Sequence, residues 1–519
     1  MNGAECLVKT LVDSGIDVCF ANPGTTEMHL VAALDGNARM RCILGLFEGV
    51  VTGAADGYAR MLGRPAATVL HLGPGLANGL SNLHNAARAQ SPLVNVIGEH
   101  ALKHIALDAP LTSDIASIAR PFSQWVRSSS NANSIATDTA AAVAAARTAP
   151  GRVASLIVPA DAAWSAVSEE SATAVAAKYL VGEPLRASDT DIDAAAAMLR
   201  SGKPTAIVLG GRSLREEPLE IAGRIAAATG ASLFAQGYAA RLTRGAGRVA
   251  VEKIPFSVDH ALSLLAGFSN FILVNGKVPV AFFGYPDKPG KLLPPHAHVQ
   301  EFVGTDGDGI YGLEALADRL GASAQTPVKA ELQLPERPTG AITPEKIGTL
   351  LAATLPEDAI VVDESITTGR GFLAATRNAR PHDWLLGTGG AIGYAMPAGC
   401  GAAIACPDRK VIVLESDGSG LFMPQTLWTY ARESLNVLVI LFANHRYQIL
   451  RGEWKNLMAV DMGPRASNLL EIGRPQVDWL GLARSLGVEA SRARSMEELS
   501  RQVDAGLAFR GPSLIEVVL

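Results

Sequence analysis

Residues 411–446 constrain the fold more than any other stretch of this chain, because they predict one strand, turn, helix and strand unit. Apolar, β-branched runs at 411–414 and 437–442 predict the two strands, and an amphipathic segment at 425–433 predicts the helix. Parallel strands joined by a helix end at the same edge of a sheet, where open α/β sheets bind ligands. We therefore expect the polar residues that follow the two strands to lie close together.

Those polar residues suit a cation and an anion at one site. Asp417 and Asn444 follow the two strands and offer hard oxygen ligands, which divalent cations prefer. Gly418 and Ser419 offer backbone and hydroxyl donors at a helix N-terminus, where phosphate groups bind. A divalent cation and a diphosphate could share this crevice. The alternative is an ordinary crossover with an aspartate cap and a polar turn.

The length and charge of the chain favour an enzyme that acts on small molecules. Its 519 residues predict about three domains of common size. Hydrophobic residues make up 48% of the chain, charged residues 18%, and the net charge is -5. A chain without an excess of basic residues lacks the electrostatic footprint of nucleic-acid binding. We therefore expect no nucleic-acid partner.

The cysteines and apolar runs predict a cytoplasmic protein without a membrane partner. The five cysteines form no CxxC pair, which favours a reducing compartment or simple core packing. The first residues lack a basic region followed by an apolar run, so we expect no secretion signal. The longest apolar run, 391–406, is too short to span a bilayer and predicts a buried helix.

Two polar residues follow predicted strands near the N-terminus. A short strand at 18–21 leads into the turn 22–27, where Pro-Gly aims Thr25 outward; the alternative is a threonine helix cap. Glu48 follows the strand 42–47 and begins a helix of small residues. Burying a charge without a partner is costly, so something should protonate or bind Glu48. It could also be a simple helix cap.

A histidine and a glycine-rich turn follow the next predicted strand. His71 comes directly after the strand 66–70 and opens the turn 71–79. Glycines let the backbone approach a ligand closely, and the strand delivers His71 into a crevice. A single histidine is more often an ordinary hydrogen-bonding residue than a catalyst. Strands at 93–98 and 153–159 complete a predicted doubly wound sheet.

The middle of the chain predicts a second α/β layer between two linkers. Its strands are expected at 206–209, 232–235, 271–274 and 299–303. Gly210-Gly211 could approach a nucleotide, although a lone pair of glycines is a weak signal. His296 and His298 predict a loop rather than a metal site, because no further ligands cluster nearby. The linkers are predicted at 168–191 and 332–343.

The last predicted domain carries two more candidate segments. Ser365 and Thr367 follow a strand at 359–363. The next strand leads into a glycine-rich turn at 387–397 that contains Ile392, which could simply fill core space.

Together these motifs resemble the thiamine diphosphate (ThDP) enzymes, most closely the branch of benzoylformate decarboxylase and acetolactate synthase. That family's GDG signature, followed after 25 to 30 residues by NN, matches here with Ser416 for the first glycine and Ala443 for the first asparagine. The resemblance covers nearly the whole chain. It implies three doubly wound α/β domains: a pyrimidine-binding domain at 1–166, a central domain at 190–331 and a diphosphate- and magnesium-binding domain at 344–519.

The resemblance also assigns roles to individual residues. It implies that Asp417, Asn444 and the carbonyl of Arg446 bind Mg2+, and that Glu48 hydrogen-bonds N1' of the aminopyrimidine. His71 becomes the leading proton donor or acceptor, with Thr25 as its hydrogen-bonding assistant. Gly390 would present a carbonyl to the 4'-amino group, and Ile392 would bend the cofactor. The remaining cofactor neighbours that it implies are Asn78, Ser365, Thr367, Gly418, Ser419 and Tyr447.

The expected function is a ThDP- and Mg-dependent 2-oxo acid decarboxylase or carboligase like benzoylformate decarboxylase. The second catalytic histidine of that enzyme belongs in the segment 278–285, which contains none. The runner-up is an acetolactate synthase large subunit, although Gly49 and Leu111 stand where the synthase usually has glutamine. Phe47 and Leu111 instead predict an apolar pocket and an aromatic or branched substrate.

Three further expectations complete the prediction. An alternative from another class of protein is a regulatory subunit that binds ThDP without turnover. A third alternative is a coenzyme A thioester lyase, but the sequence contains no recognisable nucleotide-binding tail. FAD, which the synthase branch often carries, is not required by any motif but is not excluded. Because the two ends of the cofactor would be bound on different sheets, we expect a homodimer or homotetramer.

Overall fold

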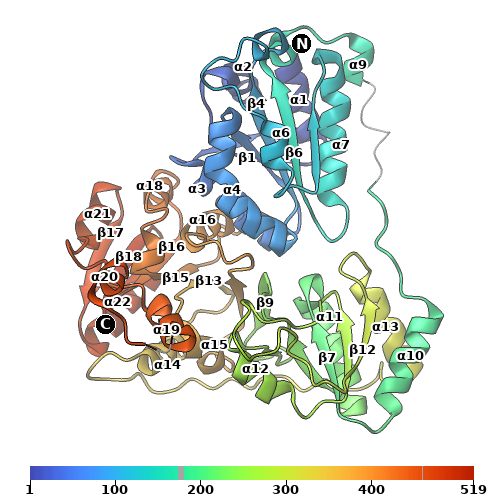
Figure 1. The fold of residues 1–519 in the computed structure, drawn as a ribbon, viewed down its shortest axis with the longest axis vertical. Coiled ribbons are helices and arrows are strands. Elements are labelled where there is room, and N and C mark those ends of the chain that lie inside the picture. The colour runs from blue at the N-terminus through green and yellow to red at the C-terminus, as the bar shows by residue number, and fades with distance from the viewer. Residues whose placement is uncertain (174–180, 459) are drawn as a thin grey trace.

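The computed structural model describes residues 1–173, 181–458 and 460–519 and contains three sheets, each flanked by helices (Figure 1). The strands of these sheets come from the first, middle and last parts of the chain. All strand pairs are parallel except one at the edge of the last sheet. This confirms the predicted class of three doubly wound α/β layers. No helix in the described ranges is both long and apolar enough to cross a membrane.

The N-terminal sheet has six strands in the order β2-β1-β3-β4-β6-β5. Its central strands are wholly buried because they are continuous apolar runs covered on both faces by helices. The edge strand β5 was not predicted, because it has four residues and only its first half is partly buried. The strands are β1 (Val18–Asn22), β2 (Arg41–Leu44), β3 (Ala66–Leu70), β4 (Leu93–Glu99), β5 (Trp125–Ser128) and β6 (Val153–Pro159). The helices are α1 (Gly3–Asp13), α2 (Met28–Asp35), α3 (Glu48–Leu62), α4 (Leu72–Ala89), α5 (Leu102–Ile105), α6 (Ile115–Ala119), α7 (Ile135–Arg147), α8 (Ala160–Trp164) and α9 (Glu169–Thr173), with the 3-10 turns η1 (Thr25–Glu27) and η2 (Ala132–Ser134).

The central sheet has five strands in the order β10-β8-β7-β11-β12, and the four predicted strands are present. Its middle strands β7 and β11 are fully buried, whereas the edge strand β12 is exposed over its first half. The strands are β7 (Thr205–Leu209), β8 (Ser232–Ala235), β10 (Glu252–Lys253), β11 (Asn270–Val274) and β12 (His298–Val303). The helices are α10 (Asp189–Arg200), α11 (Glu216–Thr229), α12 (Val258–Leu265) and α13 (Gly309–Leu320), with the 3-10 turn η3 (Gly211–Leu214).

The C-terminal sheet has seven strands in the order β17-β18-β16-β15-β13-β14-β9. Its edge strand β9 (Arg241–Arg244) comes from the middle of the chain and pairs antiparallel with β14. The other strands are β13 (Ala359–Glu364), β14 (His382–Leu386), β15 (Val411–Ser416), β16 (Val437–Ala443), β17 (Glu489–Ala493) and β18 (Ser513–Val518). The helices are α14 (Pro344–Thr354), α15 (Phe372–Ala375), α16 (Ala395–Ala405), α17 (Asp417–Gly420), α18 (Thr426–Arg432), α19 (Gln448–Leu457), α20 (Pro464–Leu469), α21 (Trp479–Ser485) and α22 (Met496–Ala508), with the 3-10 turn η4 (Thr368–Gly371).

The strand, helix and strand unit predicted from the sequence is present. β15 and β16 are parallel neighbours, with Ser416 opposite Phe442 in register. The helix α18 connects them, and the polar turn after β15 is itself the short helix α17. Because β15 and β16 end together, Asp417 and Asn444 do lie at one edge of the sheet.

The first predicted linker contains more structure than expected. Helix α9 lies within the stretch 168–191 and packs through Ala172 against the N-terminal domain, and α10 begins at Asp189. Residues 174–180 of that linker lie outside the described residues. The second linker, 332–343, holds no helix or strand in the part of the chain that the structure describes. The limits proposed for the three domains stay a prediction.

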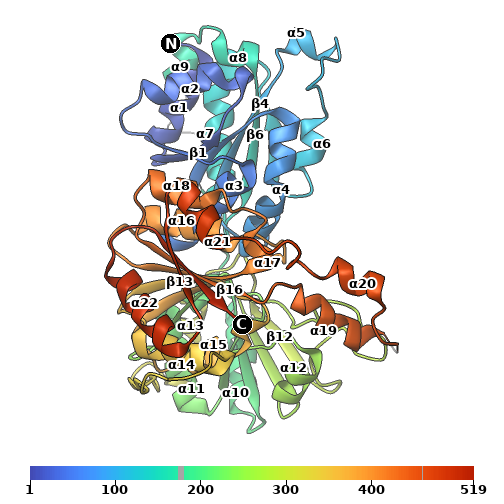
Figure 2. The same ribbon diagram turned by 90° about the vertical axis from the view of Figure 1, so that its left-hand side faces the viewer.

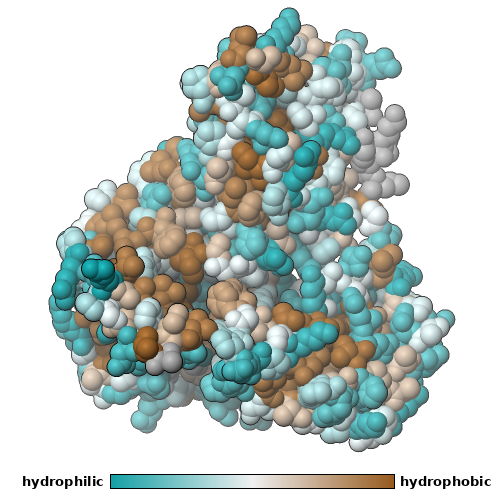
Figure 3. Space-filling model, viewed as in Figure 1, coloured by the Kyte–Doolittle hydropathy of each residue, from teal (hydrophilic) through white to brown (hydrophobic). Residues whose placement is uncertain are grey.

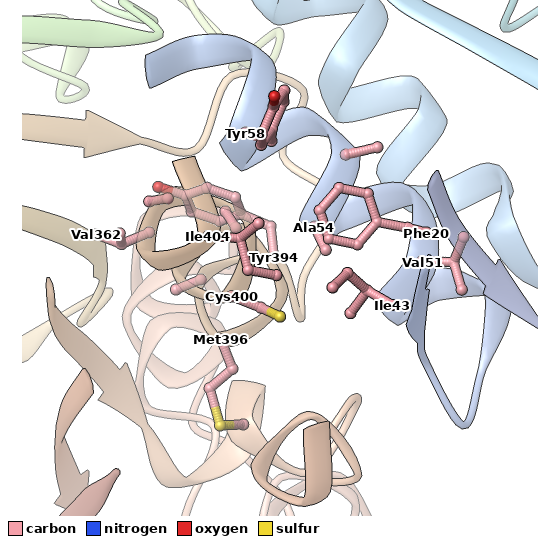
Figure 4. Close-up of a cluster of buried hydrophobic side chains, with 14 of the residues drawn as sticks. Phe20, Ile43, Val51, Ala54, Tyr58, Val362, Tyr394, Met396, Cys400 and Ile404 are labelled. Atoms are coloured by element: carbon pink, nitrogen blue, oxygen red, sulfur yellow. The ribbon is translucent and has the colours of Figure 1, made fainter. Parts of the chain in front are cut away.

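The N-terminal and C-terminal domains pack through α3 and α16, whose side chains face one another in Figure 4. Glycines allow this close approach: a Cβ at Gly57 would overlap the carbonyl of Ala398, and one at Gly401 would overlap the carbonyl of Ala54. The small-residue run predicted to be a buried helix is therefore buried against a second helix of small residues. Figures 1 and 2 show the N-terminal domain standing above the other two.

Candidate active site

The carboxyl ends of neighbouring strands bring three acid or base residues together in the N-terminal domain. Glu48 lies four positions after the end of β2, Glu27 lies in η1 after β1, and His71 follows β3 directly. Because the sheet order is β2-β1-β3, these residues converge at one edge. The topology therefore gathers residues that are 21 to 44 positions apart in the chain.

His71 and Glu27 form a hydrogen-bonded pair. His71 Nδ1 lies 2.7 Å from Glu27 Oε2, and the Glu27 side chain is fully buried while that of His71 is 22% exposed. The backbone N–H of Gly24 donates to the same Glu27 oxygen, and the Thr26 hydroxyl donates to the other. A carboxylate can only accept a hydrogen bond, so Nδ1 of His71 carries the ring proton and its N–H donates a hydrogen bond to Glu27. This leaves Nε2 of His71 as the nitrogen available to a ligand.

Two glycines make room for this pair. A Cβ at Gly98 would overlap the Glu27 carboxylate, and one at Gly24 would overlap the His71 ring. The sequence analysis did not single out Glu27, although this residue lies in the turn 22–27, two positions after Thr25. Its signal was an acidic residue three positions after a glycine at a strand end, which also fits an ordinary capping interaction.

The threonine contact to His71 is made by Thr26 rather than Thr25. Thr26 Oγ1 lies 3.3 Å from His71 Nδ1. Thr25 is exposed, and its hydroxyl makes no hydrogen bond to the residues that the structure describes. The first turn of η1 explains the difference, because adjacent residues on a tight helical turn point in different directions.

Glu48 is buried at the first position of α3, with 7% of its surface exposed. The amide of Asn78 donates to Glu48 Oε2 over 3.0 Å. Gly75 lies against the other oxygen, where an added Cβ would be 3.1 Å from Oε1. The buried carboxylate therefore has one amide donor from α4, which answers the expectation that something binds it.

In the C-terminal domain, Asp417 binds the backbone of the turn that follows β16. Its carboxylate accepts from the N–H of His445 over 2.6 Å and from that of Gly418 over 2.9 Å. Asn444 Oδ1 accepts from the N–H of Arg446 over 3.1 Å, and His445 has a positive φ of 56°. Asp417 thus lies against the turn that carries Asn444 and Arg446, so the residues that follow the two strands are close together, as expected.

The surroundings of Asp417 suit a divalent cation. Asp417 is 3% exposed, and burial raises its pKa. Its nearest basic side chain among the described residues is His445, whose Nδ1 is 3.7 Å from Oδ2. A buried carboxylate without a lysine or arginine partner is stabilised by a bound cation, and the neighbouring amide and carbonyl oxygens are hard ligands.

The turn at Gly418 and Ser419 lies beside Tyr447, and the N–H of Gly418 already donates to Asp417. A Cβ at Gly418 would lie 2.8 Å from Cε1 of Tyr447, so the tyrosine ring covers this turn. Ser419 is buried and its hydroxyl donates to the buried Glu415 carboxylate. Ser365 and Thr367 lie in the segment between β13 and η4. Ser365 is buried, and its hydroxyl donates to Asp363 Oδ1. Thr367 is half-buried, and its hydroxyl makes no hydrogen bond to a described residue.

The turn after β14 is held by two neighbouring residues of α4 in the N-terminal domain. The Asn85 amide donates to the carbonyl of Ala391 over 2.9 Å and accepts from its N–H over 3.2 Å, and His84 Nε2 lies 3.1 Å from the carbonyl of Gly389. Gly390, with a positive φ of 76°, has no hydrogen bond on its own carbonyl among the described residues. Ile392 is 36% exposed, so it does not fill core space.

A buried carboxylate that the sequence did not single out holds the other end of this turn. Glu364 accepts from the N–H groups of Gly393, Tyr394 and Ala395 over 2.9 to 3.0 Å. Burial raises its pKa to about 7, and the Glu415 carboxylate lies opposite it in the β13–β15 register. Ile392 therefore lies between two fixed points of the backbone: Ala391, which is bound by Asn85, and Gly393, which is bound by Glu364.

The two groups of residues remain separate within one chain. Glu27, Glu48 and His71 make their hydrogen bonds inside the N-terminal domain, and Asp417 and Asn444 make theirs inside the C-terminal domain. No hydrogen bond or ion pair in the described ranges joins the two groups directly.

A third feature lies between the N-terminal and central domains. A cavity of about 520 Å³ opens at the carboxyl ends of β7, β11 and β12, beside Gly211, Arg212 and Asn275. Arg215 also lines it, and burial together with Arg241 lowers the pKa of Arg215 to about 9. The predicted Gly210-Gly211 turn therefore does stand at a cavity.

Comparison with known proteins identifies the class. The sequence matches the families described as "Thiamine pyrophosphate enzyme, N-terminal TPP binding domain" over residues 1–118 and "Thiamine pyrophosphate enzyme, C-terminal TPP binding domain" over residues 368–517. These two ranges contain the Glu48 and Asp417 groups respectively. The chain therefore belongs to the thiamine pyrophosphate enzyme family.

Individual relatives show to which group within this family the chain belongs. The protein named "Putative acetolactate synthase large subunit IlvX" from Mycobacterium tuberculosis is 46% identical over 100% of this chain and 99% of its own length. Benzoylformate decarboxylase from Pseudomonas aeruginosa is 29% identical over 97% of this chain and 96% of its own. The ThDP-dependent 4-hydroxybenzoylformate decarboxylase of Rhodococcus jostii superposes with a TM-score of 0.87 at 25% identity, covering 99% of this chain and 98% of that one. The chain is thus a ThDP-dependent enzyme of the acetolactate synthase and benzoylformate decarboxylase group, which confirms the resemblance drawn from its motifs.

Proposed function

We propose that this enzyme is a ThDP- and Mg2+-dependent 2-oxo acid decarboxylase and carboligase like benzoylformate decarboxylase. The observation that carries the proposal is the pair of the partly exposed His71 with the buried Glu27, at the same sheet edge as the buried Glu48. A histidine with one nitrogen fixed by a carboxylate is suited to transfer a substrate proton with the other.

The residues described above suit the two ends of ThDP. Glu48 would hold N1' of the aminopyrimidine, with Asn78 orienting its carboxylate, and the free carbonyl of Gly390 would accept from the 4'-amino group. Ile392, exposed between its two anchors, would bend the cofactor. The bound cofactor would supply a nucleophilic carbon and an electron sink for breaking the bond to a carboxylate.

The diphosphate and the cation would lie at the C-terminal sheet. Mg2+ would be held by Asp417, Asn444 and the carbonyl of Arg446, and the backbone at Gly418 and Ser419 with the ring of Tyr447 would border the diphosphate. Because the hydroxyl of Ser365 is committed to Asp363, Thr367 offers the freer hydroxyl of the two. Ser365 would contribute mainly through its backbone position.

The chain's own proton chemistry would use two groups. Glu48 would hold a proton at N1', which favours the cofactor tautomer that can act as an internal base. His71 would give or take a proton at the substrate oxygen through Nε2, and Glu27 would keep Nδ1 protonated. Thr26 would take the assisting place that the sequence suggested for Thr25.

A second candidate is an acetolactate synthase-like carboligase. It is favoured by the name of the relative that is 46% identical, whose length the chain matches throughout. Gly49 and Leu111 argue against it, because the synthase motif has glutamine at these positions. Both candidates use the same cofactor and differ in the acyl acceptor.

A substrate screen tests the proposal. Purified protein with ThDP and Mg2+ is assayed for CO2 release and for 2-hydroxyketone products from benzoylformate, branched 2-oxo acids and pyruvate. Aromatic or branched substrates should be decarboxylated fastest. Preference for pyruvate with acetolactate as product would support the second candidate, and no CO2 release from any 2-oxo acid would refute the first.

Assembly and location complete the proposal. Since Glu48 and Asp417 make no direct contact within one chain, a second copy would bring the two groups face to face in a homodimer or homotetramer. Sedimentation of the holoenzyme tests this. The five free cysteines support a cytoplasmic location. The central cavity is where FAD would bind if present, and a flavin absorbance spectrum of the purified protein decides whether it does.

A further inference from the structure

An aromatic cluster of the central domain centres on Phe282. The Phe282 ring centroid lies 5.2 Å from that of Tyr238, 5.4 Å from that of Phe256 and 4.6 Å from that of Phe283. The last pair is T-shaped, with an interplanar angle of 73°. Aromatic rings at these separations attract one another beyond simple burial, so the cluster holds Phe282 in place.

Phe282 does not pack into the core of its own domain. Its chain neighbours Ala281 and Tyr285 pack against that core, whereas the edge of the Phe282 ring reaches Gly390 of the C-terminal domain. A Cβ added at Gly390 would lie 2.5 Å from Cζ of Phe282. The ring therefore touches the backbone two residues before Ile392, at the segment proposed to contact the pyrimidine of ThDP.

A second aromatic residue touches the same turn at Gly393. A Cβ at Gly393 would lie 2.6 Å from Cβ of Phe422, which follows the short helix α17. Phe283 and Phe422 are 52% and 53% exposed, and Ile392, which lies in the turn between Gly390 and Gly393, is 36% exposed. Figure 3 shows apolar residues gathered on the visible face of the central domain, in the region of α12. Large apolar side chains grouped and left open in this way mark a binding site.

The segment that carries Phe282 and Phe283 is the one from which a catalytic histidine was expected and is missing. Residues 278–285 contain no titratable group other than the Tyr285 hydroxyl, whose pKa is raised by burial and by Glu453. The segment therefore offers apolar contact area in place of an imidazole. Apolar side chains of this kind suit a substrate whose substituent is uncharged and either flat or branched.

We propose that Phe282 and Phe283 form one wall of the substrate's acyl pocket and select 2-oxo acids with an aromatic or branched side chain. This inference rests on the proposed decarboxylase function and deepens it by naming the residues that choose the substrate. Phe283 contacts the substituent, and Phe282 fixes Phe283 and the Gly390 turn. Phe422 closes the opposite side. These residues bind and do not transfer protons.

Steady-state kinetics of Phe283→Ala test the proposal. Benzoylformate, 4-methyl-2-oxopentanoate and pyruvate are compared in the presence of ThDP and Mg2+. Removing a ring that binds ground state and transition state alike raises KM without changing kcat, so KM for benzoylformate should rise at least about tenfold. KM for pyruvate, whose methyl group does not reach the ring, should stay within about twofold of the parent value.

Two further variants guard against indirect effects. Phe282→Leu keeps an apolar side chain at the anchor and should shift the same KM in the same direction, by a smaller factor. Val280→Ala is the matched control, because Val280 is 50% exposed on the same segment and touches neither Gly390 nor the aromatic cluster in any described contact. It should leave all three KM values unchanged.

A binding measurement separates this inference from the proposed function. Benzoate and 3-methylbutanoate carry the side chains without the reactive ketone, and their affinity for the ThDP- and Mg2+-loaded protein is measured by calorimetry. Phe283→Ala should weaken benzoate at least about tenfold. Absence of CO2 release with intact benzoate binding that depends on Phe283 would refute the decarboxylase proposal alone.

Three results would overturn the acyl-pocket assignment. The first is an unchanged benzoylformate KM and benzoate affinity in Phe283→Ala. The second is an equal loss with pyruvate, which would indicate damage to the cofactor turn. The third is a change in sedimentation of Phe283→Ala without a change in selectivity, which would assign the exposed ring to contact between copies of the chain.

Discussion

The carboxylate of Glu27 lies 2.7 Å from Nδ1 of His71, and the Glu27 side chain is completely buried. The two residues come from turns after β1 and β3, which are adjacent strands of the N-terminal sheet. Gly98 on β4 leaves the space that the carboxylate occupies. The sheet thus fixes the tautomer and the direction of the one histidine that was proposed to act on substrate.

Glu27→Gln should impair turnover more than cofactor binding. An amide can orient the ring but cannot stabilise its charged form as a carboxylate does, so kcat should fall about 10- to 100-fold. ThDP affinity should stay near the parent value, because Glu27 lies on the substrate side. The pH dependence of kcat/KM should also shift, which a purely structural role would not produce. The exposed Glu357→Gln serves as the control, and equal losses in both variants would contradict the role of Glu27.

Glu48→Gln should separate catalysis from binding at the pyrimidine end. The amide keeps the size of the side chain but cannot hold a proton at N1' in the same way, so kcat should drop about 10²- to 10³-fold. The affinity for ThDP, measured by calorimetry with Mg2+, should fall far less. An unchanged turnover rate would remove Glu48 from the mechanism.

Asp417→Ala should abolish the cation dependence of ThDP binding. In the parent protein, chelation of Mg2+ with EDTA should release ThDP, and added Mg2+ should restore it, because hard oxygen ligands hold the cation that bridges the diphosphate. In the variant, Mg2+ should no longer strengthen ThDP binding. Calorimetric titration of ThDP with and without Mg2+ measures this, and equal Mg2+ dependence in both proteins would rule out a cation site at Asp417.

Asp383→Asn should destabilise the junction between the central segment and the C-terminal sheet. Asp383 on β14 pairs with Arg241 on β9 at 2.7 Å and with Arg409 at 2.7 Å. Leaving two largely buried arginines without their carboxylate should cost about 3 kcal/mol. Thermal unfolding at pH 7 measures the loss, and Asp504→Asn, which breaks an exposed pair with Arg337, should cost less than about 1 kcal/mol.

The stabilisation lost in Asp383→Asn should depend on pH. Burial alone would raise the pKa of Asp383, but Arg241 and Arg409 outweigh it and lower the pKa from 3.8 to about 2. A folded-state pKa below the unfolded value means that the stabilisation is complete above about pH 4 and disappears as the pH falls towards 2. The difference in unfolding temperature between the parent and Asp383→Asn should therefore shrink across that interval. A constant difference would contradict the ion-pair explanation.

Some features were predictable because they depend on neighbours in the chain. The strand, helix and strand unit at 411–446 is specified by its own apolar periodicity, and the parallel pairing of β15 with β16 follows from a short helical crossover. The positions of Asp417 and Asn444 at one edge follow directly. Glu48 and His71 were found for the same reason, since each comes immediately after an apolar run.

Other features depend on which strands become neighbours, and periodicity does not specify that. Strand β9 lies in the middle of the chain yet completes the C-terminal sheet, where Arg241 pairs with Asp383. The choice of Thr26 over Thr25 depends on the exact turn of η1. Glu364 looks like an ordinary strand end until three N–H groups of the turn after β14 converge on it.

The sequence by itself determined the three α/β layers, the ThDP family and the edge of each sheet where the candidate residues gather, because local apolar patterns and strand-end positions encode them. Only the tertiary structure decided that Glu27 orients His71, that Asn85 and Glu364 anchor the turn carrying Ile392, and that Phe282 reaches Gly390. These are contacts between segments far apart in the chain, and their energies depend on burial and on the direction of side chains, which appear only when the layers have packed.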